Sequence, residues 1–498
     1  MESARLSWAA PESPWPSPKP SAASMRNEVW HAGCNRWGLK KTAHSCAVLA
    51  AIALTLQTLA FAQPTPRFMS FESAQPILKA MRGSLPAGLD AARLDPAQWT
   101  NWLKIADAAV RSRLDTGEED TLTNLLRFGV TFTKEYRIDD EYFLRYGEST
   151  LVDSFAEHRA HDLVQTLAAP GTNPGLLEMR ALLQRKGFAL KTAADRVAVK
   201  QYLLKNLTRM HQDFMQAREQ AKTNRFQMFH QRGISLDTNL WPDYDLDRQF
   251  ERMATQAMLK PGSVRRVAIV GPGLDFVNKQ EGVDYYPPQT VQPFAVLDSL
   301  LRLGLADAGA IRIDTLDISS LVNAHIRIAR QNAAMAQPYT VQLPWFSNGR
   351  WSPDFRAAFT GYWQALGSRI GEPVAPIPVP DAVEGIATRA VRVRPDMVAR
   401  VHPLDMNIVY QVLPAPPGEG FDLIVGTNIF LYYGAFEQSL ARTNTAAMLR
   451  PGGYLLSSDK LAEGVASGLS LVMTTEIPMT GEPVIADYIF CYRRGASR

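Results

Sequence analysis

The sequence predicts an α/β protein in which a mostly parallel sheet follows a helical amino-terminal region. After residue 261, short apolar runs such as 267–270 ("VAIV") alternate with stretches of helical periodicity. Each run ends in glycine or polar residues, as 423–425 ("LIV") ends shortly before Thr427 and Asn428. Buried parallel strands have this continuous apolar character because helices cover both faces of the sheet. Before residue 261, apolar residues recur mainly at helical spacing, which predicts a helical region.

The composition is typical of a globular protein that is large enough for two or more domains. The chain has 498 residues, of which 46% are hydrophobic and 20% are charged. Its formal net charge of +4 comes from well-mixed signs, and no basic block outside the leader suggests nucleic-acid binding. Only Cys491 follows residue 62, so we expect a core thiol there, and neither an internal disulfide nor a cysteine-based metal site in the folded body.

Residues 1–62 have the features of a leader with a signal peptide. Basic residues within 25–41 precede the apolar stretch 46–62, which ends in the small-x-small sequence Ala60-Phe61-Ala62. We expect cleavage before Gln63, export to the periplasm and no stable membrane association afterwards. The alternatives are a membrane anchor formed by an uncleaved signal, or a cytoplasmic protein if the leader is not used. Met25 is a second candidate for the true start.

A helical domain is expected over residues 63–260. Asp95 is the expected N-cap of a helix with Pro96 in its first turn, and further helices are expected at about 150–168, 174–186 and 192–222. The acidic run 115–120 ("DTGEED") is expected to form a solvated turn and helix start between helices rather than a catalytic carboxylate pair. His158 and His161 have no third ligand in view, so we expect surface histidines and no metal site.

The first strand of the sheet, 267–270, is followed by Gly271-Pro-Gly273. Glycines at this point allow the backbone to pass close to a ligand. A dinucleotide fingerprint requires a third glycine where Phe276 stands, and a helix that starts at once rather than near 290–304. The turn therefore favours a ligand without phosphates.

The second strand, within 311–319, ends at Asp317. A carboxylate there can accept hydrogen bonds from both hydroxyls of a ribose, and such charge-assisted bonds are strong. The alternative is that Asp317 caps the following helix. Residues 332–398 are rich in Pro, Trp and Phe and are expected to be an insertion over the sheet. Further strands are expected in 397–409 and 421–433, and 440–459 predicts a helix, a Pro-Gly-Gly turn and a strand.

Thr427 and Asn428 stand at the carboxyl end of the expected strand in "FDLIVGTNIFLYY", 421–433. Ligands of parallel sheets bind outside the carboxyl ends of the strands, so this polar pair is a candidate for ligand contact. The alternative is that both are ordinary turn residues at a strand end.

This order of strand, glycine-rich turn, acidic strand end and closing "LRPGGYLLSSD" resembles class I S-adenosylmethionine-dependent methyltransferases over residues 264–495 or so. Within 311–459 the chain is most similar to the chemotaxis-receptor methyltransferase type, in which segments like "VRVRPDMVARVHPLDMNIV" and "FDLIVGTNIFLYY" occur in the same order. The likeness does not extend to the helical region or the leader. It implies a Rossmann-like domain over 261–498 and S-adenosylmethionine as cofactor.

The resemblance also implies a role for particular residues. Asp317 would bind the cofactor ribose, Asn407 the adenosine end and Asn428 the methionine end, while Tyr432 would lie near the transferred methyl group. The cofactor-binding residues implied in this way are Gly271, Gly273, Asp317, Asp405, Asn407, Thr427 and Asn428. The chain departs from the chemotaxis-receptor methyltransferases at two points: Thr427 stands where that family usually has arginine, and "GPGLDF" replaces its longer, more polar first turn. The protein-glutamate substrate of that family is therefore not implied. "TNIF" also lacks the Asn-Pro-Pro-Tyr signature of adenine methylation.

Three functions are compatible with these observations. The leading one is a methyltransferase acting on a small molecule or a protein side chain, a reaction in which the protein mainly positions the reactants. Tyr432 and Tyr433 could present an aromatic face or a phenolic oxygen to the sulfonium methyl, or could simply pack. The second is an exported binding or structural protein that retains an inactive methyltransferase fold, which the leader favours because the cofactor is made in the cytoplasm. The third, a Rossmann oxidoreductase, is disfavoured by Phe276, and the oligomeric state is left open.

Overall fold

The computed structural model describes residues 65–90, 94–146, 153–221, 233–234, 240–275, 284–346, 351–380, 385–414, 416, 419–462, 467–480 and 485–495. The predicted leader and Phe276 lie outside these residues. Pro64–Arg498 form one compact unit, within which the predicted domain boundary at 260/261 stays a prediction. Among the described residues, no helix combines the length and the apolar character needed to cross a bilayer.

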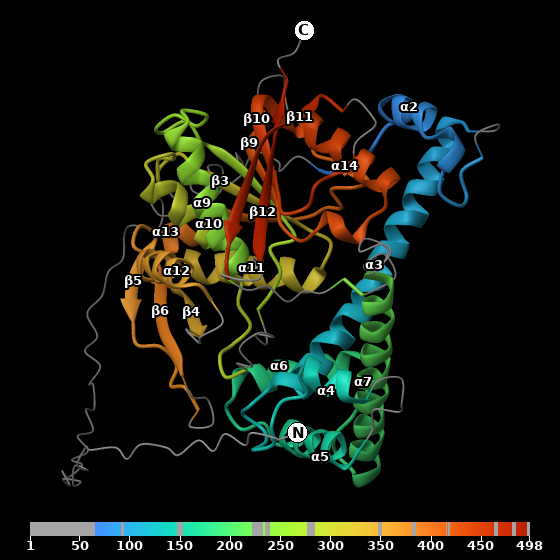
Figure 1. The fold of residues 1–498 in the computed structure, drawn as a ribbon, viewed down its shortest axis with the longest axis vertical. Coiled ribbons are helices and arrows are strands. Elements are labelled where there is room, and N and C mark those ends of the chain that lie inside the picture. The colour runs from blue at the N-terminus through green and yellow to red at the C-terminus, as the bar shows by residue number, and fades with distance from the viewer. Residues whose placement is uncertain are drawn as a thin grey trace, which may run out of the picture. The chain divides into compact units, whose positions relative to one another are not determined.

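The centre of the fold is a seven-stranded sheet with the order β11-β12-β10-β9-β2-β3-β7 (Figure 1). Its strands are β2 (Arg266–Val270), β3 (Arg312–Asp317), β7 (Val401–Asp405), β9 (Phe421–Gly426), β10 (Leu449–Ser457), β11 (Leu469–Pro478) and β12 (Ala486–Arg494). Neighbouring strands from β7 to β10 are parallel, whereas β12 is antiparallel to both β10 and β11. A dinucleotide-binding sheet has six strands in the order 3-2-1-4-5-6, so each half continues outward from the centre in chain order. The reversed strand β12, inserted between β10 and β11, is instead the class I methyltransferase arrangement, which confirms the predicted fold class.

Successive strand residues pack against two different groups of helices, since side chains alternate between the faces of a sheet. Val267 and Ile269 belong to a core cluster with α9 (Trp241–Thr255), α10 (Gln292–Arg302) and α11 (Ser320–Ala334). Ala268 and Val270 belong to a second cluster with α2 (Phe71–Ala80), α14 (Ala435–Met448) and the first half of α3 (Pro96–Phe128). Both faces are therefore covered, which explains the uninterrupted apolar runs. Cys491 is buried in the first cluster, and the core thiol predicted from its strand is confirmed.

Helix α3 connects the sheet with the rest of the helical region. Asp95 caps it as predicted, because its carboxylate accepts a hydrogen bond from the amide of Gln98 at 2.8 Å. Its 33 residues extend over about 50 Å at 1.5 Å per residue. Trp99 near its start packs in the second core cluster, while Leu122 near its end packs in the first. Figure 1 shows α3 running from α2 towards α4 (Asp140–Tyr146), α5 (Ser154–Ala168), α6 (Pro174–Arg185) and α7 (Ala193–Ala221).

One expectation about this region is wrong. The acidic run 115–120 lies inside α3 rather than in a turn between helices. The helix continues because the residues that follow, such as Leu122, are fully buried against neighbouring helices. The acidic side chains pair with cations of those neighbours, Glu118 with Lys186 at 2.9 Å and Asp120 with Arg209. The run therefore holds helices together.

The segment between α11 and β7 forms a second, antiparallel sheet with the order β4-β6-β5. It comprises β4 (Tyr339–Phe346), β5 (Gly371–Val374) and β6 (Ile386–Val393), with α12 (Pro353–Ala365) between β4 and β5. Trp241 of α9 stacks on Phe355 and Phe359 of α12, with ring centroids 5.5 and 4.7 Å away. The aromatic residues of the predicted insertion thus form its contact with α9. Short elements elsewhere are β1 (Arg67–Phe68), β8 (Gln411–Val412) and α13 (Pro395–Val398).

Candidate functional site

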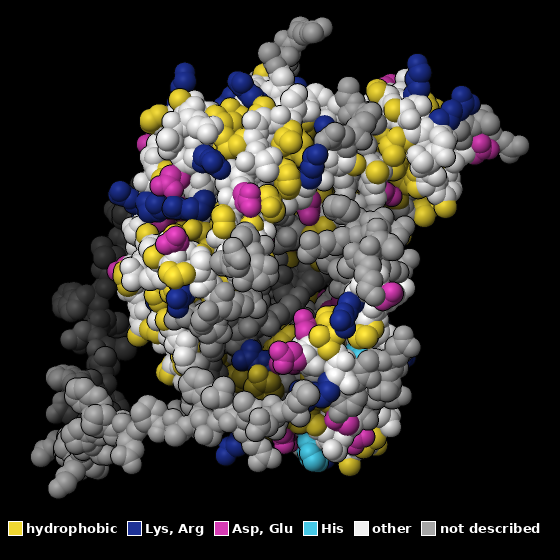
Figure 2. Space-filling model, viewed as in Figure 1, with side chains coloured by type: hydrophobic (Ala, Val, Ile, Leu, Met, Phe, Trp, Pro, Cys, Tyr) yellow, Lys and Arg dark blue, Asp and Glu magenta, His cyan; other side chains and the backbone are white. Residues whose placement is uncertain are grey.

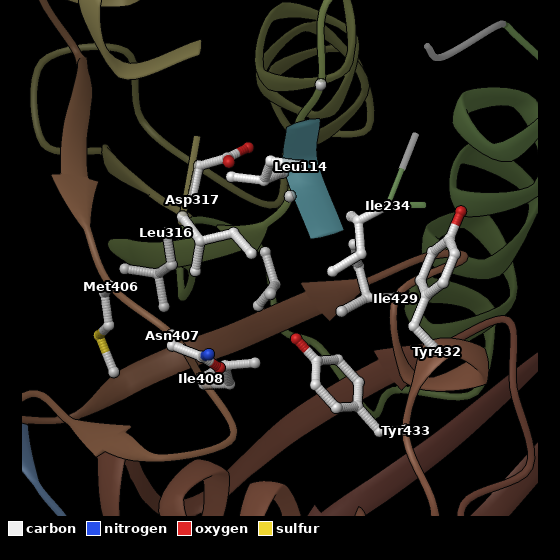
Figure 3. Close-up of a pocket in the computed structure, with 14 residues that line it drawn as sticks. Leu114, Ile234, Leu316, Asp317, Met406, Asn407, Ile408, Ile429, Tyr432 and Tyr433 are labelled. Carbon is white, nitrogen blue, oxygen red and sulfur yellow. The ribbon is translucent and has the colours of Figure 1, made fainter. Parts of the chain in front are cut away.

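A cavity of about 60 Å³ lies at the carboxyl ends of β2, β3 and β7. Figure 3 shows Asp317 and Leu114 on one side of it and Asn407 and Tyr433 on the other. Its walls contain five of the residues that the resemblance assigned to cofactor binding or catalysis: Gly271, Gly273, Asp317, Asn407 and Tyr432. Apolar strand-end side chains supply most of the remaining surface, among them Leu316 and Met406. This first cavity therefore combines apolar walls with one carboxyl, one amide and two phenols.

The two glycines of the turn after β2 have backbone conformations that other residues rarely adopt, with φ of +62° at Gly271 and +67° at Gly273. A Cβ atom added to Gly271 would lie 2.3 Å from Cδ1 of Ile429. The amide of Gly271 is itself tied to the sheet, since it donates to the carbonyl of Leu316 at 2.9 Å. The glycine backbone thus lines the first cavity beside Ile429, which leaves no room for a side chain at Gly271.

Asp317 is 6% exposed and lies at the end of β3. Its Oδ1 atom accepts a hydrogen bond from the amide of Ser319 at 2.7 Å. Burial raises the pKa of Asp317 to about 7, although hydrogen bonds from the amides of Ser319 and Gly273 oppose that rise. Helix α11 is capped by Ser319, whose hydroxyl accepts from the amide of Val322, so the alternative in which Asp317 is the helix cap is wrong.

Helix α3 closes one side of the first cavity. Leu114 of α3 and Ile234 line it together with the strand ends (Figure 3). The side-chain amide of Asn407 donates to Asp107 of α3 at 2.8 Å. The Asn407 amide that the resemblance assigns to the adenosine end of the cofactor is thus hydrogen-bonded to the protein's own helix.

Asp405 lies outside this cavity wall. Its side chain is 62% exposed and forms an ion pair with Arg111 of α3 at 2.7 Å. Arg111 also contacts Asp107 at 2.9 Å and donates to the carbonyl of Ile318 at 3.1 Å. Asp405 therefore contributes to docking α3 on the sheet edge.

Tyr432 belongs to the short 3-10 helix η2 (Phe430–Tyr432) that follows β9. The guanidinium carbon of Arg113 lies 5.8 Å from the centre of its ring, and Arg113 donates to the carbonyl of Tyr432 at 3.2 Å. Burial lowers the pKa of Arg113 and raises that of Tyr433, which stays a neutral phenol at physiological pH. One aromatic ring of the wall is thus already in contact with a cation.

Thr427 and Asn428 lie outside the first cavity and line a second one, of about 560 Å³. Asn428 has a left-handed backbone, with φ of +56°, which asparagine tolerates better than most residues. Its amide donates to the hydroxyl of Ser458 at 2.7 Å, and Thr427 accepts from the side-chain amide of Gln292 at 3.0 Å. The polar pair thus forms a hydrogen-bonded turn at the strand end, and that turn borders the second cavity.

The contribution of α3 to this site was not predicted from the sequence. The spacing of Asp107, Arg111 and Leu114, by four and then three residues, places them on one helix face. That shared face was the only sign in the sequence that they act together. Their partners at the sheet edge lie some 200 to 300 residues further along the chain, and no spacing rule connects segments so far apart. In the described ranges, no group of three or more His, Cys, Asp or Glu is arranged to hold a metal ion.

No protein-family model matches the chain, and no curated protein matches it either. Among solved structures, the N-methyltransferase NodS from Bradyrhizobium japonicum WM9 is 12% identical, with a TM-score of 0.23 over 51% of this chain and 97% of that one. The magnesium protoporphyrin IX methyltransferase ChlM from Synechocystis PCC 6803, solved with bound SAM, is 10% identical, with a TM-score of 0.24 over 57% and 97%. TrmN from Thermus thermophilus is 12% identical, with a TM-score of 0.23 over 50% and 53%. The order and direction of the strands, rather than these distant similarities, define the fold.

Proposed function

We propose that the protein is an S-adenosylmethionine-dependent methyltransferase that binds its cofactor in the first cavity. The observation that carries the proposal is that the Gly271/Gly273 turn and Asp317 line one cavity at the carboxyl edge of a sheet with the class I strand order. A buried carboxyl beside bare backbone suits a nucleoside, whose ribose hydroxyls donate hydrogen bonds and whose remaining surface is large and flat.

Each side chain then has a definite role. Asp317 holds the ribose, the glycine turn allows close approach, and Asn407 contacts the adenosine end once its amide is released from Asp107. Tyr432 lies beside the methyl group as an aromatic face that accepts positive charge. The sulfonium supplies an already activated methyl group, so these residues position the reactants and exclude water.

The first cavity must widen before a nucleoside can bind. Its 60 Å³ is far below the volume of about 300–1,000 Å³ found in sites that enclose small molecules. Leu114 and Ile234 are the side chains at its closed side (Figure 3). In our proposal, α3 moves away from the strand ends and closes again over the bound cofactor.

A second candidate function is an inactive methyltransferase fold used for binding or structure. The hydrogen bond between Asp107 and Asn407, together with the apolar plug of Leu114, favours it. Under this alternative, the contacts that close the site are permanent, and α3 is a structural helix.

The methyl acceptor is a small molecule or a protein side chain in this proposal. The mixed charges and the leader features support a protein that is exported and does not bind nucleic acid. Export would require a source of cofactor outside the cytoplasm.

Calorimetric titration of the full chain with S-adenosylmethionine and S-adenosylhomocysteine tests the proposal. We expect binding that Asp317→Ala weakens by about 1.5–3 kcal/mol, the range for a hydrogen bond to a charged group, which is roughly tenfold to a hundredfold. Tyr432→Phe is expected to leave the affinity unchanged and to lower only the rate of methyl transfer. Asn428→Ala tests the role in cofactor binding that the resemblance assigns to this residue. The absence of heat with either ligand, on folded protein, would favour the inactive fold.

A further inference from the structure

The second cavity, of about 560 Å³, lies where the end of β9 meets the starts of α9 and β12. Thr427 and Asn428 line it, while Ile429, the next residue, lines the first cavity. Consecutive residues of one strand end therefore border both spaces. A substrate in the second cavity would lie beside the strand end that borders the proposed cofactor site.

Two carboxyl groups form part of the wall of this cavity. Asp245 of α9 is 5% exposed, and its polar partner among the described residues is the Asp487 carboxyl of β12. Burial raises the pKa of both, and the negative charges of Asp487 and Asp243 raise that of Asp245 further. Two buried carboxyls held together in this way favour a ligand that brings positive charge.

Asp247, on the same helix, is a buried carboxylate that does have cationic partners. It is fully buried and forms ion pairs with Arg248, at 3.0 Å, and with Arg302. No arginine or lysine lines the second cavity within the described part of the chain. A buried carboxyl that faces a cavity without a counter-charge is costly unless a ligand supplies one.

Part of the remaining wall is aromatic, and the rest is aliphatic or polar. Trp241 and Trp351 lie with their ring centroids 4.8 Å apart, and both line the cavity together with Tyr488. Aromatic faces bury carbon skeletons and attract cations. Aromatic walls and an acidic pair together suit an amine attached to an apolar group.

We propose that the second cavity is the methyl-acceptor site and that it takes an amine, with its carbon skeleton against Trp241 and Trp351 and its nitrogen against the Asp245–Asp487 pair. This assignment rests on the proposed methyltransferase function and names its substrate class. The carboxylate pair takes a proton from the bound ammonium, which its raised proton affinity suits, and so frees the nitrogen lone pair. That lone pair forms the new N–C bond while the C–S bond of the sulfonium donor breaks and leaves its electron pair on sulfur, and the product leaves as the N-methylated ammonium ion.

Calorimetry on the full chain with 2-phenylethylamine and with its neutral counterpart 2-phenylethanol tests the site. We expect the amine to bind at least about tenfold more tightly than the alcohol, because only the amine can form a charge-assisted hydrogen bond. Repeating the titration in buffers of different ionisation enthalpy is expected to show proton release on amine binding.

Asp245→Asn and Asp487→Asn are each expected to remove the preference for the amine and the proton release. Glu251→Gln is the matched control, because it removes a carboxylate from the same helix α9 at a half-exposed position outside the cavity. Equal binding of amine and alcohol, binding of neither, or unchanged preference in both aspartate variants would overturn the amine site. Preference for the amine without any binding of S-adenosylhomocysteine would instead overturn the methyltransferase proposal and leave a cation-binding site.

Discussion

At the scale of single residues, burial sets the charge of the carboxyl in the first cavity. The pKa of Asp317 rises from its ordinary value of 3.8 to about 7, so the folded protein binds its proton more tightly than the unfolded chain does. Its contribution to stability is therefore complete below pH 3.8 and declines as the pH rises through about 7. At low pH the protonated Asp317 thus stabilises the fold without ligand. At high pH the ionised carboxylate is the better acceptor for the hydrogen bonds of ribose hydroxyls.

We predict that the affinity for S-adenosylhomocysteine increases from pH 6 to pH 8, by at most about tenfold per unit. Asp317→Asn should abolish this increase, because an amide does not ionise. Calorimetric titration at three pH values measures it, with Asp354→Asn, an exposed carboxyl at the start of α12, as the control. An affinity independent of pH in the parent protein would contradict the role given to Asp317.

The effect of burial on Asp243, at the start of α9, can be tested through the pH dependence of protein stability. Burial raises its pKa to about 8, while the neighbouring Gln292 side chain opposes that rise. Asp243→Asn should therefore stabilise the protein relative to the parent, and the gain should grow with pH by up to about 1.4 kcal/mol per unit between pH 5 and pH 8. Denaturant unfolding across that range measures it. A difference that stays constant with pH would show that Asp243 is ionised in the fold.

At the scale of elements, α3 belongs to both core clusters and also closes the first cavity. Its first half packs beside α14 and its second half beside α5 and α7. The ion pairs of Arg111 with Asp107 and Asp405 hold it at the sheet edge. These contacts are partly exposed and so contribute modestly to stability. The larger resistance to a movement of α3 comes from its fully buried residues, such as Trp99 and Leu122.

Shortening the plug on α3 should favour cofactor binding. Leu114→Ala removes apolar atoms from the first cavity, so the ligand no longer has to displace this side chain. We therefore expect about threefold to tenfold tighter binding of S-adenosylhomocysteine. Leu114→Trp should block binding. Ile105→Ala is the control, since Ile105 is a 61% exposed apolar residue on the same helix. Tighter binding in the Ile105 variant as well would point to a general loosening of α3 rather than to the plug.

The elements differ in how far the sequence predicted them. The strands and most helices follow from local periodicity, and Asp317 and the glycine turn were placed by their position after apolar runs. Helix α3 was predicted to break at 115–120 because acidic residues favour helix starts, but tertiary burial of the following turn overrides that preference. The closure of the site by Leu114 depends on a contact with segments 200 or more residues away, which local patterns do not encode.

At the scale of the whole molecule, charges of both signs are mixed on the face drawn in Figure 2. Figure 2 shows basic and acidic side chains interspersed over the face in view, without a patch of one sign. This agrees with the small formal net charge of +4.

Export is a prediction about the whole chain. A bacterium that expresses it should release a mature form beginning at Gln63 outside the inner membrane, because Ala60-Phe61-Ala62 matches a signal-peptidase site. Cell fractionation followed by amino-terminal sequencing measures this. Replacing Ala60 and Ala62 with larger residues should stop the cleavage. Intact Met25 on protein in the cytoplasmic fraction would contradict export and remove the problem of cofactor supply.

The most direct test of the account is a crystal structure of the chain saturated with S-adenosylhomocysteine. We predict that both ribose hydroxyls lie within hydrogen-bonding distance of the Asp317 carboxylate, over the Gly271/Gly273 turn. Leu114 and Ile234 should be displaced from their positions in Figure 3, and the bond between Asp107 and Asn407 should be broken. A first cavity that stays closed and empty at saturating ligand, with α3 in its present position, would contradict the proposed cofactor site.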